Sequence, residues 1–348
     1  MAKSTWGRKL DLENGRVDMT HGSGGKAMAQ LVDELFVAAF DNPMLSKKND
    51  QALFEVPAGR MVMTTDGYVV SPLFFPGGDI GSLAVHGTIN DVAMAGAKPL
   101  YLAASYILEE GFPLADLRRI VLSMAKAARD ADVAIVTGDT KVVERGKGDG
   151  VFISTTGVGL VPPRVVAPSG DRARPGDVVL VSGTLGDHGV AILSAREGLA
   201  FETSIVSDSA ALHRLVARMV EVVPDVHVLR DPTRGGLSAT LNEIAQQSGV
   251  GMMLDESAIP VRQEVTAACE LLGMDPLHLA NEGKLVAICG HRDAAHLLAA
   301  MRADPLGKDA AIIGTVTDDA HRFVQMATPF GTKRILDWLV GEALPRIC

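Results

Sequence analysis

Cysteine is scarce in this chain of 348 residues, which holds three: Cys269, Cys289 and the final residue, Cys348. No two of them form a CxxC pair, so the sequence argues against a disulfide framework and against a zinc knuckle. Cys269 and Cys289 lie in apolar stretches, where cysteine behaves as a small hydrophobic residue. We expect both to fill a core, which leaves Cys348 as the thiol that requires an explanation.

Basic charge and long apolar runs are lacking too. The formal net charge is -9, with 33 Lys and Arg against 42 Asp and Glu, whereas a nucleic-acid surface needs a basic footprint. No apolar run approaches the roughly 18 residues of a membrane span, and the start of the sequence has no signal-peptide core. We therefore expect a cytoplasmic protein that binds neither nucleic acid nor membrane.

The familiar nucleotide-binding loops are absent as well. The run HGSGGK, residues 21–26, looks like a phosphate loop, but Thr20 stands where a Walker motif needs its first glycine and Ala27 where it needs Ser or Thr. No GxGxxG motif opens a predicted helix. The sequence therefore predicts that any ATP is bound in another way.

The glycine-dense loop still offers backbone N–H groups to an anion. Gly24 and Gly25 supply such groups, and Lys26 adds positive charge at the start of the following predicted helix. His21 is a further possible phosphate contact. The alternative is a flexible N-terminal loop that binds nothing.

Hydrophobic residues make up 47% of the chain and charged residues 22%, which is enough apolar material for two domains. Strand and helix patterns alternate in both halves, so the fold class is α/β or α+β in each, and the proline- and glycine-containing residues 162–177 are the predicted linker. The predicted helices span 27–40, 80–96, 114–130, 187–197, 208–222, 236–248, 261–272 and 292–301, and the predicted strands span 60–65, 68–71, 133–137, 151–161, 178–182, 250–254, 285–289 and 311–316.

Aspartates recur at the predicted ends of apolar segments, several of them beside glycine. They are Asp66 in TTDGY, Asp91 in INDVAMAGAKP, Asp139 in TGDTK and Asp231 in RDPTRGG, with Asp50 in KKNDQA as a fifth. Any one of them is compatible with a simple turn. Together they favour Mg²⁺, which is usually held by a few carboxylates and phosphate oxygens.

The terminal cysteine follows a hydrophobic segment and ends the tetrapeptide PRIC. A thiol there is anchored by one peptide bond only, and if the chain is pinned near Gly341, the residues beyond it can reach roughly 23 to 25 Å. Cys348 is not fourth from the end, so it is no prenylation signal. Two readings remain: a mobile carrier of a chemical group, or an accidental thiol on a frayed end.

The motifs taken together resemble the HypE family of hydrogenase maturation factors, within the superfamily of aminoimidazole ribonucleotide synthetase and selenophosphate synthetase. The resemblance runs through nearly the whole chain and is carried by HGSGGK, TTDGYVV, INDVAMAGAKP, GDTKVV, DPTRGG, NEGKL and the terminal PRIC. It implies a homodimer joined through the sheets of the first domain, with the ATP site near the join. It also implies the following division: a glycine-rich loop and helix (1–45), a PurM-like ATP-binding domain with a mixed sheet (46–165), a PurM-like α/β domain (175–330) and a mobile tail (331–348).

The resemblance implies a reaction as well. In such proteins the carbamoyltransferase HypF loads a carbamoyl group onto the terminal cysteine, here Cys348. ATP then activates the carbamoyl oxygen, and loss of phosphate leaves a thiocyanate. The nitrile is passed to iron on the HypC–HypD complex and becomes the cyanide ligand of a NiFe hydrogenase.

Site residues are carried over from the family one at a time. Lys141 would face the carbamoyl oxygen or the γ-phosphate, and Glu282 in NEGKL would act as the base near the nitrogen. The expected ligands of Mg²⁺ are Asp50, Asp66, Asp91, Asp139 and Asp231, and the expected nucleotide contacts are His21, Gly24, Gly25, Lys26, Asp66, Asp91 and Asp139.

Two rival functions stay open at this point. Another synthetase of the same superfamily would use ATP and the same acids, but it gives Cys348 no role, and a selenophosphate synthetase needs a reactive residue in a glycine loop that here contains no cysteine. A non-catalytic scaffold that delivers iron would need further soft or imidazole ligands near the tail.

Overall fold

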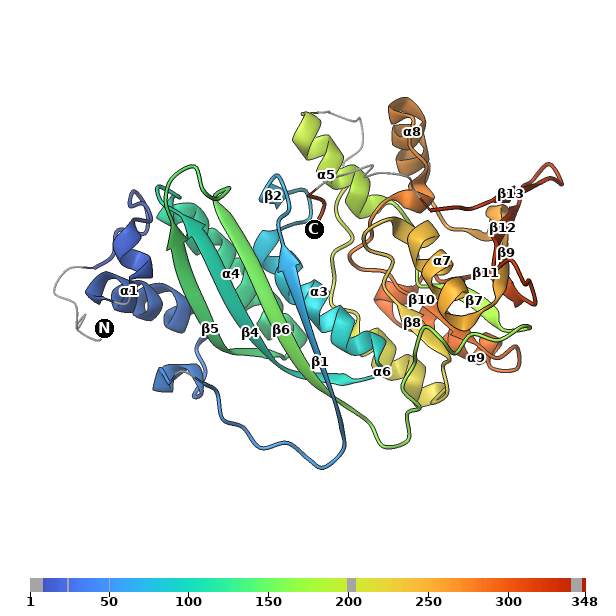
Figure 1. Cartoon of the computed structure of the whole chain (residues 1–348), viewed down its shortest axis with the longest axis horizontal. Coiled ribbons are helices and arrows are strands. Elements are labelled where there is room, and N and C mark those ends of the chain that lie inside the picture. Colours follow the sequence, from blue (N-terminus) through green and yellow to red (C-terminus); the bar gives the residue numbers. More distant parts are fainter. Residues whose placement is uncertain (1–8, 24, 50, 199–204, 339–345) are drawn as a thin grey trace.

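The computed structural model describes residues 9–23, 25–49, 51–198, 205–338 and 346–348. Gly24, Asp50 and the segment 339–345 of the predicted tail therefore lie outside the described residues. Figure 1 shows two α/β units side by side, the first built on a four-stranded sheet and the second on a seven-stranded sheet. The C-terminus lies between them, near β2 and α5.

The first sheet has the strand order β1-β6-β4-β5. Neighbouring strands run antiparallel except for β4 and β5, which are parallel. Helices α3 and α4 cover one face of this mixed sheet (Figure 1). The elements are β1 (Arg60–Tyr68), β2 (Phe74–Phe75), β3 (Gly78–Asp79), α3 (Ile80–Met94), β4 (Lys98–Glu109), α4 (Leu114–Ala131), β5 (Ala134–Val143) and β6 (Val151–Val161).

Helix α3 begins at a capping box. The Asp79 carboxylate accepts hydrogen bonds from the backbone of Gly81 and Ser82, and the Ser82 hydroxyl lies 3.1 Å from the Asp79 backbone nitrogen. The helix is buried on nearly all sides because the sheet, α4 and the second domain all pack against it. The elements that precede β1 are η1 (Met19–Gly22), α1 (Lys26–Leu31), a π-helical stretch (Val32–Val37), α2 (Ala38–Phe40) and η3 (Leu45–Lys47).

The second sheet has the strand order β13-β12-β9-β11-β7-β10-β8. Its interior strand β7 is buried on both faces, as expected for four consecutive apolar residues. The elements are β7 (Val178–Val181), α5 (Asp187–Glu197), α6 (His213–Val222), β8 (Val228–Arg230), α7 (Gly236–Ser248), β9 (Gly251–Asp255), η4 (Glu256–Ala258), α8 (Gln263–Leu272), η5 (Pro276–His278), β10 (Val286–Cys289), α9 (Ala294–Arg302), η6 (Pro305–Gly307), β11 (Ala311–Thr317), β12 (Val324–Ala327) and β13 (Lys333–Ile335).

The structure corrects three of the predicted elements. Asp66 and Asp139 do not end strands, because pairing with the neighbouring strand continues to Tyr68 after the first and to Val143 after the second. The helix predicted over 208–222 begins only at His213. The long strand β4 has no counterpart among the predicted elements, although it lies in the middle of the first sheet.

The internal cysteines are buried, as predicted. Cys269 packs in a small cluster with Val190 and Leu279, and Cys289 is part of the core that joins the two domains. Among the helices of the described residues, none combines the length and the apolar character that a membrane crossing requires.

Candidate active site

Four acidic residues from both domains gather around one region. Asp66 lies in β1, Asp91 on α3, Asp231 directly after β8, and Glu282 shortly before β10. Each of Asp66, Asp91 and Asp231 contributes to raising the pKa of Glu282. The predicted Asp66, Asp91, Asp231 and Glu282 are therefore brought together, although more than 200 residues of sequence separate the first from the last.

Burial and the charge of a neighbouring acid act together on Asp231. Part of its surface reaches solvent, yet it is packed deeply enough that burial, helped by Asp91, raises its pKa to about 7. Burial also raises the pKa of Asp91, against a hydrogen bond of 2.9 Å that the Thr64 hydroxyl donates to it. A cluster of carboxylates that repel one another favours a cation between them.

A magnesium ion fits this donor set. Hard carboxylate oxygens suit Mg²⁺, which commonly takes only one or two carboxylates from the protein and the rest of its ligands from water and phosphate. Among the described residues, no three His, Cys, Asp or Glu side chains form a ready-made metal site. Asp66, Asp91 and Asp231 are the residues that would hold the ion, and Mg²⁺ itself stays a prediction.

Glu282 is a buried carboxyl, 3% exposed, whose position is fixed by its backbone. Its N–H donates to the Asp208 carboxylate at 3.0 Å, and its carbonyl accepts from the Asn90 amide at 3.2 Å. The Oε1 atom has no hydrogen-bond partner among the described residues. Burial first and the charge of Asp231 second raise the pKa of Glu282 well above its ordinary value. Such a carboxyl, poorly solvated and unpartnered, is typical of a functional site.

The end of the chain reaches this same region. The Cys348 carbonyl accepts a hydrogen bond of 3.0 Å from the Val69 N–H, and the Arg346 carbonyl accepts one of 3.1 Å from the Ser71 N–H. These residues directly follow β1, so the chain end pairs with an extension of that strand. Burial, and then the charge of Glu282, raises the pKa of the Cys348 thiol to about 12. The terminal thiol and the buried carboxyl therefore share one environment.

Asp139 and Lys141 lie apart from this acidic cluster in the structure. Both are on β5, where the Lys141 ammonium pairs with the Asp139 carboxylate at 2.6 Å. Strand β5 forms one edge of the first sheet and β1 the other. The strand register puts Asp139 in one row with Gly67, three strand spacings away, which is about 14 Å. Within one chain these two residues do not join Asp66.

The glycine-rich loop lies on the β5 side as well. Gly22 packs so closely on Val142 that a Cβ there would come 2.6 Å from the Val142 nitrogen. His21 is buried, and its Nδ1 accepts a hydrogen bond from the Asp18 N–H at 3.0 Å, so only Nε2 is left for a phosphate. Gly25 and Lys26 are exposed at the start of α1. The predicted nucleotide contacts thus fall into two groups at opposite edges of the sheet.

Sequence reasoning missed the residues that hold this region in place. Asp208 and Asn90 position Glu282, and His188 contacts the chain end, as described below. The sequence pattern places Asp208 in a helix, which in the structure begins only at His213. Asn90 stands directly before Asp91, but nothing in its spacing indicated a contact with residue 282.

Two family models match the chain. The model for the AIR synthase related protein, N-terminal domain, covers residues 48–161, and the model for the corresponding C-terminal domain covers residues 174–327. The carbamoyl dehydratase HypE of Cupriavidus necator is 71% identical over 342 residues, which cover 98% of this chain and 97% of that protein. The protein of the same name from Escherichia coli is 49% identical over 337 residues, covering 95% of this chain and 99% of that protein.

Solved structures agree with these relatives. A crystal structure of the hydrogenase maturation protein HypE in complex with ATP superimposes with a TM-score of 0.91 at 53% identity, covering 95% of this chain and 99% of that one. A crystal structure of a HypE–HypF complex gives a TM-score of 0.79 at 50% identity, covering 89% and 99%. The predicted family and the predicted pair of PurM-like domains are confirmed.

Proposed function

This chain belongs to the HypE family of AIR synthase related proteins, and on that premise we propose that it acts in the maturation of NiFe hydrogenase as an ATP-dependent carbamoyl dehydratase. Cys348 carries the carbamoyl group, which is converted to a thiocyanate. The observation that carries the proposal is the chain end itself: Cys348 lies in the environment of Glu282, and the charge of that carboxyl contributes to raising the thiol pKa.

The proposed reaction removes the elements of water from S–C(=O)NH₂. The carbamoyl oxygen attacks the γ-phosphorus of ATP, ADP leaves, and the nitrogen loses one proton. Loss of the second nitrogen proton and departure of phosphate then leave S–C≡N. The carbamoyl oxygen ends in the phosphate, and no external oxidant or reductant is needed.

Glu282 is the proposed base for the nitrogen protons. A carboxyl whose pKa is raised takes up a proton more readily once it is ionised, which suits general base catalysis. Its backbone contacts to Asp208 and Asn90 hold it in place. Mg²⁺, bound by Asp66, Asp91 and Asp231, would neutralise charge on the transferred phosphoryl group.

A second copy of the chain would complete the site. Asp139, Lys141 and the glycine-rich loop lie at the sheet edge opposite Asp66, about 14 Å away, so within one chain they do not reach a phosphoryl group held at Asp66. In a homodimer joined through the first-domain sheets, the partner subunit's Lys141 approaches the carbamoyl oxygen or the γ-phosphate. We propose HypF as the source of the carbamoyl group and the HypC–HypD complex as the acceptor of the nitrile.

The experiment that tests the function is mass spectrometry of the terminal peptide. After incubation with HypF, carbamoyl phosphate and ATP, we expect a carbamoyl adduct on Cys348, followed by a species lighter by one water. Cys348→Ala should abolish both species and leave ATP binding nearly unchanged. Cys269→Ala serves as the matched control and should behave like the wild type.

Measurement of phosphate release separates the remaining alternatives. A carbamoyl dehydratase releases phosphate from ATP in step with thiocyanate, so release should depend on the carbamoyl donor. Release that is independent of both the donor and Cys348 would favour another synthetase of the superfamily. No release at all would favour a scaffold.

A further inference from the structure

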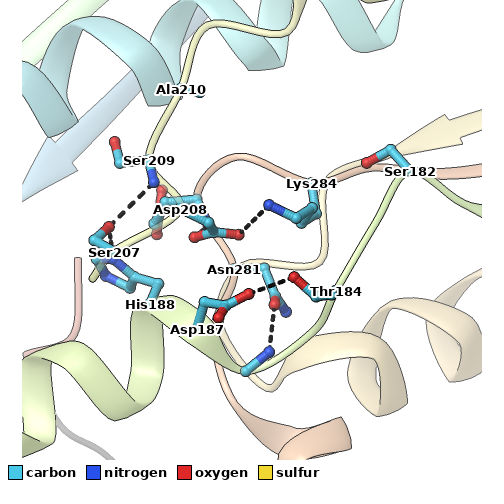
Figure 2. A network of polar contacts seen from close by, with 12 residues as sticks. Ser182, Thr184, Asp187, His188, Ser207, Asp208, Ser209, Ala210, Asn281 and Lys284 are labelled. Carbon is cyan, nitrogen blue, oxygen red and sulfur yellow. Dashed lines mark hydrogen bonds and ion pairs between the residues drawn. The ribbon is translucent and has the colours of Figure 1, made fainter. Parts of the chain in front are cut away.

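His188 is a buried histidine that contacts the end of the chain. It is the second residue of α5 and has no exposed surface. Its Nε2 lies 2.9 Å from the Ile347 carbonyl oxygen, and its Nδ1 lies 2.7 Å from the Ser207 hydroxyl. Figure 2 shows the imidazole beside Ser207, whose hydroxyl also meets the Ser209 backbone nitrogen, at 3.1 Å.

These contacts fix which group donates and which accepts in each hydrogen bond from the Ile347 carbonyl through His188 to Ser207. The Ile347 carbonyl only accepts, so the His188 Nε2 must carry the proton and donate. Burial lowers the pKa of His188, which keeps the ring neutral and leaves Nδ1 as an acceptor. The Ser207 hydroxyl therefore donates to Nδ1 and accepts from the Ser209 N–H. The imidazole is held in the one tautomer that can bind the chain end.

The turn formed by Ser207, Asp208 and Ser209 holds both reacting partners of the proposed reaction. Ser207 orients His188, which holds the last peptide, and Asp208 binds the N–H of Glu282 and pairs with Lys284 at 3.2 Å (Figure 2). The turn is tied to the first domain, because the Ser207 N–H donates to the Pro76 carbonyl at 2.8 Å. The distance between the terminal thiol and the buried carboxyl is set through these few contacts.

Helix α5 contacts the chain end at a second point, through Arg196. The Arg196 guanidinium donates to the Arg346 carbonyl at 2.9 Å and to the Ser71 carbonyl at 2.8 Å. Arg196 follows His188 by eight residues and so lies on the same face of the helix. Between these contacts the Ile347 side chain is buried, 4% exposed.

We propose that His188 is a positioning residue for the terminal cysteine: its Nε2–H holds the Ile347 carbonyl and so keeps the Cys348 sulfur beside Glu282. The inference deepens the proposed function, since a docked thiol matters only if it carries the substrate. His188 has no hydrogen bond to Glu282 or to the sulfur among the described contacts, and it acts through the last peptide. Its role is distinct from that of the base.

Two substitutions distinguish the contact made by the Nε2 atom of His188 from the contact made by its Nδ1 atom. In His188→Gln, an amide nitrogen stands close to the position of Nε2 and can still donate to the Ile347 carbonyl. In His188→Asn, the shorter amide reaches only the position of Nδ1, so the contact with Ser207 survives and the contact with the chain end is lost. Both variants keep a polar group in the buried site.

The first readout is the rate at which iodoacetamide alkylates Cys348, followed by peptide mass spectrometry without ATP or partners. We expect His188→Asn to raise this rate about 2- to 10-fold, the range that loss of one hydrogen bond implies, and His188→Gln to stay near the wild type. The buried Cys269 and Cys289 report on folding and should remain unreactive. Equal rates at Cys348 in the wild type and His188→Asn would overturn the inference.

If His188→Asn does not fold, Ser207→Ala provides the second test. It removes the donor to Nδ1 and frees the ring to adopt the other tautomer, which presents a lone pair to the Ile347 carbonyl. We expect faster alkylation of Cys348 there too, and a long-range ¹H–¹⁵N spectrum should show that the Nε2–H form of His188 is no longer the sole species. An unchanged spectrum together with an unchanged rate would contradict the inference.

The second readout is conversion of carbamoylated Cys348 to thiocyanate in a single turnover. His188→Asn should slow it and leave the Kd for ATP unchanged, and His188→Gln should restore it. The two proposals fail in different ways. If the wild type makes no thiocyanate, the dehydratase function is wrong. The alkylation rates of the wild type and His188→Asn still test whether His188 holds the chain end. If the wild type makes thiocyanate and His188→Asn matches it in both readouts, the positioning role of His188 is wrong.

Discussion

Glu282, the proposed base, is a residue whose side chain we expect to lower the stability of the fold. Its carboxyl is buried, Oε1 has no partner among the described residues, and its pKa is raised. In the unfolded chain it ionises near pH 4.3, an ordinary value for glutamate. Between that pH and the raised folded pKa, the folded state holds the extra proton, so this residue makes folding less favourable as the pH rises.

Glu282→Gln should therefore stabilise the protein at neutral and alkaline pH while it abolishes thiocyanate formation. The free-energy difference between the variant and the wild type should grow above about pH 4.5, by at most roughly 1.4 kcal/mol per pH unit. Urea unfolding at pH 5 and pH 8 measures it. A variant less stable than the wild type at pH 8 would show that the carboxyl is favourably bound in the fold.

Asp91 tests the predicted metal site. Asp91→Asn keeps the size of the side chain and its contact with Thr64, so the fold should survive. Mg²⁺-dependent ATP turnover should fall about 100-fold or more, because even outer partners of metal ligands are worth roughly 10- to 100-fold. Asp116→Asn, at a half-buried position in the first turn of α4, is the matched control. Wild-type turnover in Asp91→Asn would remove this residue from the site.

Residue types indicated the chemistry better than they indicated the geometry. Asp66, Asp91, Asp231 and Glu282 could be selected from their motifs, and the structure gathers them. Within one chain Asp139 lies apart from them, at the other edge of the sheet, and sequence order does not say which sheet edge a strand occupies. Asp208 and His188 could not be found, since a positioning role depends on contacts between segments far apart in the chain.

At the scale of elements, strongly periodic helices were predictable and the central strand was not. Helix α4 carries a clear apolar stripe and is predicted almost to the residue, whereas β4 has the small residues Ala103, Ala104 and Ser105 in its middle, which give a weak strand signal. The segment 208–212 is not helical because its polar groups bind residues of other segments. The Asp208 carboxylate accepts a hydrogen bond from the Glu282 N–H, and the Leu212 N–H donates to the Asn90 side chain. Tertiary contacts overrode local propensity there.

The terminal segment makes its own prediction about length. The chain end pairs with the residues after β1 through the Arg346 and Cys348 carbonyls, and Ile347 is buried between the domains. Two glycines added after Cys348 keep the thiol but must displace this pairing or enter the site. Thiocyanate formation should fall by up to ~100-fold, as for other misplacements of about 1 Å.

The same two glycines added at the N-terminus are the control for that extension and should leave turnover unchanged. Full turnover in the C-terminally extended protein would mean that the site accepts an internal cysteine. In that event the position of Cys348 at the very end of the chain would have no functional meaning.

At the scale of the whole molecule, one face of the first sheet has no helix packed on it in the described part of the chain. Helices α3 and α4 cover the other face, and β1 turns Met61 and Met63 outward with 50% and 73% of their surfaces exposed. Leu160 and Val158 pair with them across the strands. A contiguous apolar face of this kind typically marks an interface, and the proposed occupant is a second copy of the chain.

Met63→Glu should convert the dimer to a monomer, because it places a charge among the exposed apolar side chains of the edge strand β1. Sedimentation at micromolar concentration should give a dimer for the wild type and for Phe330→Glu, a control at a residue of the second domain that is 92% exposed. The Met63→Glu monomer should lose ATP turnover too, since Asp139 and Lys141 lie across the sheet from Asp66 and must come from a partner. A monomer with full turnover would refute the shared site, and a wild-type monomer would refute the dimer itself.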